Sequence, residues 1–146
     1  MGRIAAAAPR ALEDFAGRWR LSRRISDALA GEVLVGEGVL AFRPAPGGGL
    51  IYDEEVRLTA PGRPALRGFR RYLWQAAPGG IAVAFEDGRP FHRIALGAGQ
   101  AADRHDCAPD LYRVRYDFSG WPLWSVRWEV TGPRKSYVSQ TDFRRD

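Results

Sequence analysis

Apolar residues recur at every second position through most of this chain, and this period of two constrains the fold more than any other feature. In the clearest case Tyr112, Val114, Tyr116 and Phe118 alternate with charged residues. Successive side chains of a strand point to opposite faces, so the alternation predicts strands with one buried face. Comparable segments, bounded by glycine and proline turns, lie at 19–25, 34–42, 50–58, 68–75, 81–85, 91–96, 100–107, 112–118, 124–130 and 137–143.

About eight to ten strands at even spacing predict an all-β protein. Simple hairpin connections favour a closed antiparallel up-and-down barrel, because closure leaves no free sheet edge. Gly36 and Gly38 share one face of their strand and would let it bend, as a barrel corner requires. One short N-terminal helix is expected over residues 9–15, where Pro9 suits the first turn and Gly17 would end it.

The length of 146 residues fits one domain, so we expect residues 1–146 to form a single barrel domain, with 1–8 as a flexible extension. Cys107 is the single cysteine, which excludes an intrachain disulfide and favours a reducing, cytoplasmic setting. The N-terminus is too weakly apolar for a signal peptide, and no run of about 18 apolar residues predicts a transmembrane helix. We therefore expect a protein with no membrane partner.

The net charge of +5 raises the question of nucleic-acid binding. Of the 22 basic residues, Lys135 is the only lysine, a ratio typical of a GC-rich bacterial genome. The arginines are also spread along the chain in single residues and short pairs. Charge without clustering is weak evidence, so the pattern argues against a nucleic-acid partner.

The opening Phe15-Ala16-Gly17-Arg18-Trp19 resembles the Gly-x-Trp signature at the first strand of lipocalins and other calycins. In that superfamily the tryptophan closes one end of the barrel, and an arginine near the last strand packs across it. The resemblance assigns this second role to Arg144 or Arg145.

Further motifs cover most of the chain and resemble a bacterial family catalogued as domain of unknown function 6314. That family has no activity attached to it, so the resemblance implies a fold and a set of positions rather than a function. The motifs are Phe-x-Gly-x-Trp (15–19), Tyr52-x-Glu54, Tyr72-x-Trp74, Phe85-x-Asp87-Gly88-Arg89-x-Phe91-His92, His105-x-Cys107-x-x-Asp110-x-Tyr112 and Gly132-Pro133-Arg134-Lys135-x-Tyr137.

Polar residues that share a strand face with aromatic residues are candidates for a ligand site inside the barrel. If these faces point inward, the interior holds one carboxylate, Glu54, and two cations, Arg70 and Lys135. Unpaired burial of such charges is costly, so they must pair or meet a ligand. The candidate ligand-binding residues are Tyr52, Glu54, Arg70, Tyr72, Trp74, His92, His105, Tyr112, Trp128, Lys135 and Tyr137.

Two structural explanations of these positions stay open. In the first, Glu54 forms a buried ion pair with Arg70 or Lys135 and no ligand is bound. A one-residue bulge would also turn the faces of a strand over. Lys135 also has two explanations. In a functional role its compact ammonium would bind a carboxylate or phosphate, or form a Schiff base with a ligand; in the other explanation it is a chance surface lysine without a function.

Both histidines of the chain lie in one segment with the sole cysteine. His92, His105 and Cys107 are metal-ligand types, and positions 105 and 107 share a strand face, so three ligands would converge if residue 92 lies on a neighbouring strand. Haem held by one histidine is a related hypothesis. The alternative is a hydrogen-bonded histidine pair near the barrel rim, with Asp110 capping the turn after Pro109.

The leading functional hypothesis is a barrel that encloses a small, amphipathic and anionic molecule. The first alternative is a small enzyme that uses buried Tyr, His and Glu groups, or the His/Cys metal site, for acid–base work. The second is a nucleic-acid or protein adaptor acting through the basic exterior. No catalytic residue and no cofactor is assigned, a homodimer stays open, and no P-loop, dinucleotide fingerprint or hydrolase elbow is present in the sequence.

Overall fold

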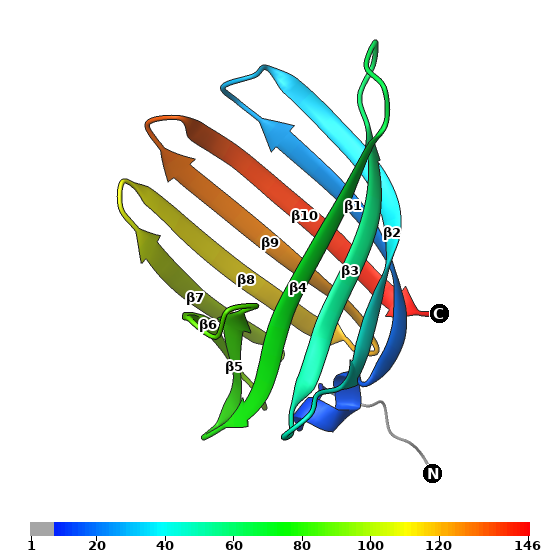
Figure 1. Cartoon of the computed structure of the whole chain (residues 1–146), viewed down its shortest axis with the longest axis vertical. Coiled ribbons are helices and arrows are strands. Elements are labelled where there is room, and N and C mark those ends of the chain that lie inside the picture. The colour runs from blue at the N-terminus through cyan, green and yellow to red at the C-terminus, as the bar shows by residue number, and fades with distance from the viewer. Residues whose placement is uncertain (1–7) are drawn as a thin grey trace.

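The computed structural model describes residues 8–146, and these residues form ten strands and one short 3₁₀ turn (Figure 1). The turn, η1, spans Leu12–Phe15. The expectation of a flexible extension over residues 1–8 falls, for residues 1–7, outside the described part. The strands are β1 (Gly17–Asp27), β2 (Glu32–Pro44), β3 (Leu50–Thr59), β4 (Leu66–Ala77), β5 (Gly80–Phe85), β6 (Pro90–Ala95), β7 (Gln100–Cys107), β8 (Asp110–Gly120), β9 (Leu123–Gly132) and β10 (Lys135–Arg145).

All strands belong to one antiparallel sheet with the order β6-β5-β4-β3-β2-β1-β10-β9-β8-β7. Sequence neighbours pair throughout, and the first strand meets the last, with Trp19 opposite Arg145. The sheet curls until β6 and β7 face each other, where the backbone N–H of Arg93 donates to the Asp103 carboxylate at 2.7 Å. The structure therefore confirms the predicted up-and-down barrel, in a nearly closed form.

The predicted alternation appears directly as alternating burial. On β8, Val114, Tyr116 and Phe118 are buried, whereas Arg113 and Arg115 between them are exposed. Apolar burial of one face is the main free-energy gain of such strands, and the polar face keeps them hydrated. The interior of the barrel is consequently the place where all ten strands contribute side chains.

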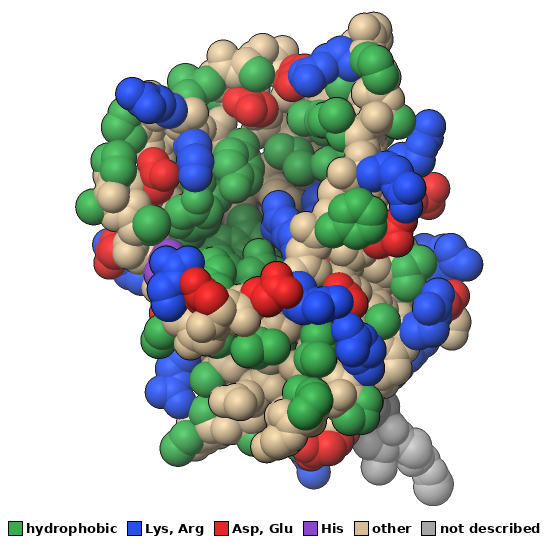
Figure 2. Space-filling view, viewed as in Figure 1, with side chains coloured by type: hydrophobic (Ala, Val, Ile, Leu, Met, Phe, Trp, Pro, Cys, Tyr) green, Lys and Arg blue, Asp and Glu red, His purple; other side chains and the backbone are tan. Residues whose placement is uncertain are grey.

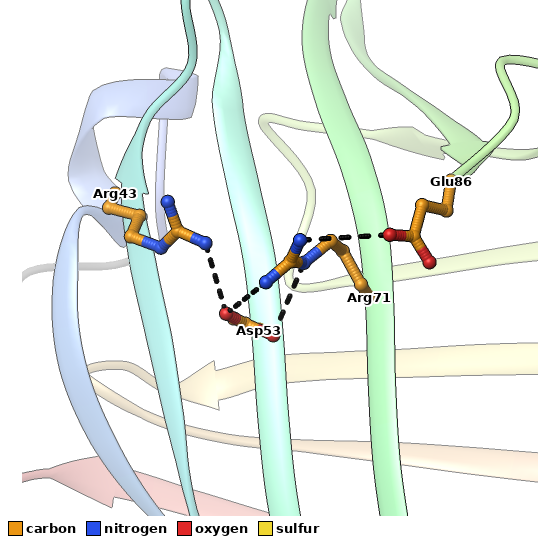
Figure 3. Close-up of polar contacts among 4 residues, drawn as sticks. All are labelled: Arg43, Asp53, Arg71 and Glu86. Carbon is orange, nitrogen blue, oxygen red and sulfur yellow. Dashed lines mark hydrogen bonds and ion pairs between the residues drawn. The ribbon is translucent and has the colours of Figure 1, made fainter.

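Opposite charges occupy cross-strand positions on the outer face of β2, β3 and β4. Asp53 accepts hydrogen bonds from Arg71 and Arg43, and Arg71 reaches on to Glu86 at 3.6 Å (Figure 3). The hydrogen bond from Arg71 is the main cause of a lowered pKa of the Asp53 carboxyl. Exposed ion pairs of this kind contribute little individually, so they set the character of the surface rather than the stability.

Aromatic packing closes one end of the barrel. Trp19 is fully buried, and its indole N–H donates to the carbonyl of Phe15 at 2.9 Å. The Arg145 guanidinium lies 3.8 Å from the centre of the Trp19 ring and donates to the carbonyls of Ala16 and Asp14. Of the two arginines that the calycin resemblance offers for this role, the structure assigns Arg145.

The short helix predicted over residues 9–15 is a 3₁₀ turn of four residues, Leu12–Phe15. A segment so short cannot support an α-helix by itself and takes its conformation from packing. Leu12 and Phe15 are both buried beneath the barrel end. The turn therefore acts as a plug.

The opposite end of the barrel has walls of unequal height. Neighbouring strands are antiparallel and η1 leads into β1, so the turns after β1, β3, β5, β7 and β9 lie away from η1. β4 has 12 residues, whereas β5 and β6 have six each, so their hairpin ends well below the turn between β3 and β4 (Figure 1). The wall of the barrel is therefore lower at this hairpin than at the turn between β3 and β4.

Gly36 and Gly38 allow the backbone of β2 to lie close to that of β3. A Cβ atom at Gly38 would lie 2.0 Å from the carbonyl oxygen of Glu55, and one at Gly36 equally close to that of Arg57. No side chain fits at these distances, which explains why the bend of β2 uses glycine at both positions. Among residues 8–146, no helix has the length and apolarity needed to cross a membrane.

Candidate ligand-binding site

A cavity of about 400 Å³ occupies the barrel interior at the end away from η1. Figure 2 looks into a hollow with hydrophobic walls, and a basic side chain lies at its edge. This volume lies within the range of pockets that bind small molecules. The residues that line it, called the cavity below, are Arg70, Tyr72, Phe85, Arg89, Phe91, His105, Cys107, Tyr112, Trp128, Val130, Tyr137 and Ser139.

Stacked aromatic rings form one wall of the cavity. Phe91 stacks on Trp128 with ring centres 5.1 Å apart and planes 7° from parallel, and on its other side Phe85 lies at 4.3 Å. The pairing of β5 with β6 shifts at Val83, so that both Phe91 and His92 are buried although they are consecutive in sequence. This bulge adds an aromatic ring to the wall that strict alternation would have placed outside.

Two exposed arginines line the cavity, and Arg89 pairs with Asp87. Arg70 is the cation without such a partner. It faces Glu54 in the register of β3 and β4, yet it forms no ion pair with any acidic side chain of residues 8–146. Burial raises the pKa values of the Tyr72 and Tyr137 hydroxyls, and the nearby charge of Arg70 offsets part of this rise. The cavity thus holds a guanidinium without a carboxylate partner beside two neutral phenols.

A buried ion pair between Arg23 and Glu54 lies deeper in the barrel. Two hydrogen bonds of 2.7 Å join the guanidinium to the two carboxylate oxygens. Arg23 also donates to the Thr141 hydroxyl at 2.8 Å, and the Tyr52 hydroxyl donates to Glu54 at 2.5 Å. Each nitrogen of the guanidinium and each oxygen of the carboxylate therefore has at least one hydrogen bond within the protein.

The electrostatics of this pair follow from burial and from the short contacts. Burial alone raises the pKa of Glu54, but the hydrogen bonds and charge of Arg23 outweigh it, and the pKa lies below its usual value. Burial likewise opposes the charge of Arg23, and Glu54 more than compensates, so that the pKa of Arg23 is raised. The pKa of the Tyr52 hydroxyl is raised by burial and by the neighbouring carboxylate. Both members of the pair are therefore charged at neutral pH.

One alternative left open by the sequence was an ion pair of Glu54 with Arg70 or Lys135, and in the structure the partner of Glu54 is Arg23 instead. Sequence reasoning missed Arg23, although a signal was present. Position 23 has the same parity as Trp19, Leu21 and Ile25, which places it on the inner face of β1. A charged residue in an apolar face is a candidate for a buried pair.

A second, smaller space of about 30 Å³ lies beneath the cavity. Arg70, Tyr72 and Trp128 line both spaces and so form the boundary between them. A volume of this size holds one water-sized group. The residues around it, called the inner chamber below, are Arg23, Tyr52, Arg70, Tyr72, Trp74, Val83, His92, Tyr116, Trp124, Val126, Trp128, Thr141 and Phe143.

Both histidines pack edge-on against the Phe91 ring, with ring centres 4.7 Å (His92) and 5.1 Å (His105) from it. His92 is buried in the inner chamber wall, His105 is half-buried in the cavity, and Cys107 is exposed. Within residues 8–146 no group of three or more His, Cys, Asp or Glu side chains is arranged to hold a metal ion. The geometry therefore does not support the metal site predicted from His92, His105 and Cys107.

Lys135 lies at the rim of the barrel rather than inside it. Its side chain is 44% exposed, and its ammonium donates to the Tyr112 hydroxyl at 2.8 Å and contacts Asp110 at 3.3 Å. The hydrogen bond to Tyr112 comes first among the causes that raise the pKa of Lys135. Because Lys135 begins β10, its side chain can reach solvent even though its parity matches the inner face. Lys135 thus links the start of β10 to β8 at the open end of the barrel.

The remaining candidates divide between the two spaces. Tyr52, Trp74 and His92 line the inner chamber, with Glu54 held behind it by Arg23, whereas His105, Tyr112 and Tyr137 line the cavity. Sequence reasoning did not select several further lining residues. These are Arg23, Val83, Phe85, Arg89, Phe91, Tyr116, Trp124, Val126, Val130, Ser139, Thr141 and Phe143.

Comparison with solved structures supports the fold. An S-type phycobiliprotein lyase, CPES from Guillardia theta, superposes with a TM-score of 0.64 over 92% of this chain and 90% of the lyase, at 10% sequence identity. A protein of unknown function from the DUF3598 family of Nostoc punctiforme gives a TM-score of 0.59 at 10% identity over 94% of this chain. This chain covers 49% of that protein, about half its length. At such identities the likeness concerns the fold alone.

Similarity in sequence identifies the family. No curated protein matches the chain at a significant level. Residues 15–145 match a family described as "Family of unknown function (DUF6314)". The match begins at Phe15, the last residue of η1, and ends at Arg145. It therefore includes Trp19 and the arginine that packs on it at the closed barrel end. The chain belongs to the DUF6314 family.

Proposed function

We propose that this protein binds a small, amphipathic and anionic molecule in the barrel cavity. The observation that carries the proposal is a cavity of about 400 Å³ with aromatic walls and an Arg70 guanidinium that has no acidic partner among the described residues. Aromatic walls favour a ligand with flat apolar surfaces. Arg70 favours an anionic group on that ligand, since a guanidinium binds carboxylate, sulfonate or phosphate oxygens in pairs.

The contrast with Arg23 supports this assignment. Arg23 is neutralised by Glu54 in a bidentate pair, so it has a structural role. Arg70 lies one step closer to the mouth, and its charge faces the cavity instead of a carboxylate. A phycobiliprotein lyase has a similar barrel fold, which is compatible with ligand binding.

The interior favours binding over acid–base catalysis. Both oxygens of Glu54 accept hydrogen bonds from Arg23, so this carboxylate is not available as a base for a ligand. Burial lowers the pKa of His92 to about 4, well below the range in which a histidine exchanges protons efficiently at neutral pH. We therefore propose a binding protein rather than an enzyme.

The experiment compares two probes of similar shape. The anionic probe is 1-anilinonaphthalene-8-sulfonate and the neutral probe is N-phenyl-1-naphthylamine, both followed by fluorescence titration. We expect the protein to bind the anionic probe more tightly. Arg70→Met should weaken anionic binding about tenfold, because it removes a charge-assisted hydrogen bond, and should leave the neutral probe unaffected.

A matched control separates the cavity from the general positive charge of the protein. Arg113→Met removes an arginine of equal charge from the exposed outer face of β8 and should change neither affinity. The proposal fails if Arg70→Met leaves anionic binding unchanged, or if Arg113→Met weakens it as strongly.

A further inference from the structure

The inner chamber contains nitrogen atoms that lack hydrogen-bond partners. The indole Nε1 atoms of Trp74 and Trp124 and the Nδ1 atom of His92 are buried without a partner among the described residues. All three side chains line the inner chamber. A buried polar group without a partner destabilises the folded state, and native structures contain few of them. Three such side chains around one space make it a candidate site for a hydrogen-bonding group of a ligand.

These groups select a hydrogen-bond acceptor. An indole N–H only donates, so Trp74 and Trp124 can be satisfied only by an acceptor atom. His92 contacts the Tyr116 hydroxyl through Nε2 at 3.4 Å, so its Nδ1 atom donates when Nε2 accepts from the tyrosine. Because burial lowers the pKa of His92 to about 4, the ring is neutral at physiological pH and adds no positive charge.

The charges around the inner chamber disfavour a second anion there. Two arginines line it: Arg23, whose terminal nitrogens both already donate to Glu54, and Arg70 at its boundary with the cavity. An anion in the chamber would lie near the Glu54 carboxylate, which repels it. The charge of Arg23 is already neutralised by Glu54, so the anion would be buried without compensation from this arginine, which is costly. Arg70 at the boundary is the nearest free cation within residues 8–146, and the cavity above it has room for the anionic group.

We infer that the inner chamber binds an uncharged acceptor atom, such as a carbonyl oxygen, of the same ligand whose anionic group meets Arg70. The inference rests on the proposed function and narrows its ligand to an aromatic acid that also carries a carbonyl or ether oxygen. The volume of about 30 Å³ admits one such atom and not a ring. The flat part of the ligand then lies against Phe91 and Trp128.

The experiment uses naphthoates that differ in one atom. 6-Acetyl-2-naphthoate and 4-acetyl-2-naphthoate are each compared with the isopropenyl compound, in which a methylidene group replaces the carbonyl oxygen. The two positions offer two distances between the acid and the acceptor. Isothermal titration calorimetry should show at least one acetyl compound binding about five- to tenfold more tightly than its isopropenyl counterpart, since one hydrogen bond is added.

Variants link this preference to the inner chamber. Trp74→Phe and Trp124→Phe keep an aromatic ring and remove the N–H, and at least one should abolish the preference while the isopropenyl compound binds as before. Melting temperatures report whether each variant is folded. Equal binding of both compounds, with Arg70→Met still weakening both, would overturn this inference and leave the proposed function in place. Absence of binding by all four naphthoates together with both naphthalene probes would reject the proposed function itself.

Discussion

At the scale of single residues, the Arg23–Glu54 pair dominates the polar interior. Both side chains are almost completely buried, and each depends on the other for compensation. Removing one partner of such a pair leaves an isolated charge, whereas replacing both with apolar residues is often neutral. Removal of one member of the pair should therefore destabilise the fold, whereas replacement of both members by apolar residues should not.

This gives a prediction for stability. Arg23→Met should lower the free energy of unfolding by about 3–5 kcal/mol, because Glu54 is then buried without a cation. The double variant Arg23→Met, Glu54→Leu should recover most of the loss. Urea denaturation of the three proteins measures both effects. A loss below about 1 kcal/mol in the single variant would mean that Glu54 reaches solvent when Arg23 is absent.

His92 gives a pH dependence. Its pKa is lowered by burial from 6.5 to about 4, so between these values the unfolded chain binds a proton that the folded protein does not. Stability contributed by the neutral ring is complete above the unfolded pKa and is lost as the pH falls. From pH 7 to pH 5 the loss should be about 2 kcal/mol for this group.

Two variants isolate this contribution. His92→Phe should flatten the change in unfolding free energy between pH 7 and pH 5, and His105→Phe should retain it, because His92 is still present in that variant. Denaturation midpoints at several pH values provide the measurement. An unchanged slope in His92→Phe would show that other groups cause the pH dependence.

Residue roles were predictable from the sequence only in part. Glu54 and Tyr52 were placed in the interior by parity with Leu50 and Val56, and both are buried. The partner of Glu54 was not found, because β1 and β3 are not hydrogen-bonded to each other and the contact crosses β2. Lys135 has inward parity, but parity does not reveal that a long side chain at a strand end can turn to solvent.

At the scale of elements, alternation located all ten strands because each has one apolar face and a turn rich in glycine or proline at its end. The 3₁₀ turn at Leu12–Phe15 was taken for a helix, since spacing of three residues fits either conformation. The shift in pairing between β5 and β6 left no sequence signal, and it decides that Phe91 and His92 are both buried. A bulge depends on the neighbouring strand and not on local preference.

At the scale of the whole molecule, closure is achieved at two places. Backbone pairing joins β1 to β10, with Arg145 packed on Trp19, while side-chain and backbone contacts across the β6–β7 gap complete the ring. The fold was predictable from strand number and turn spacing. The cavity was not, because its volume depends on how rings from β4 to β10 fill the interior and on the short β5–β6 hairpin, where the barrel wall is lower.

The most direct test of a ligand-binding barrel is the crystal structure of the protein with 1-anilinonaphthalene-8-sulfonate. We expect the probe inside the cavity, with its sulfonate oxygens within hydrogen-bond distance of the Arg70 guanidinium and its rings against Phe91 and Trp128. The finding that would contradict this is a cavity filled by the protein's own side chains, or a probe bound solely on the outer face, beside exposed arginines such as Arg113.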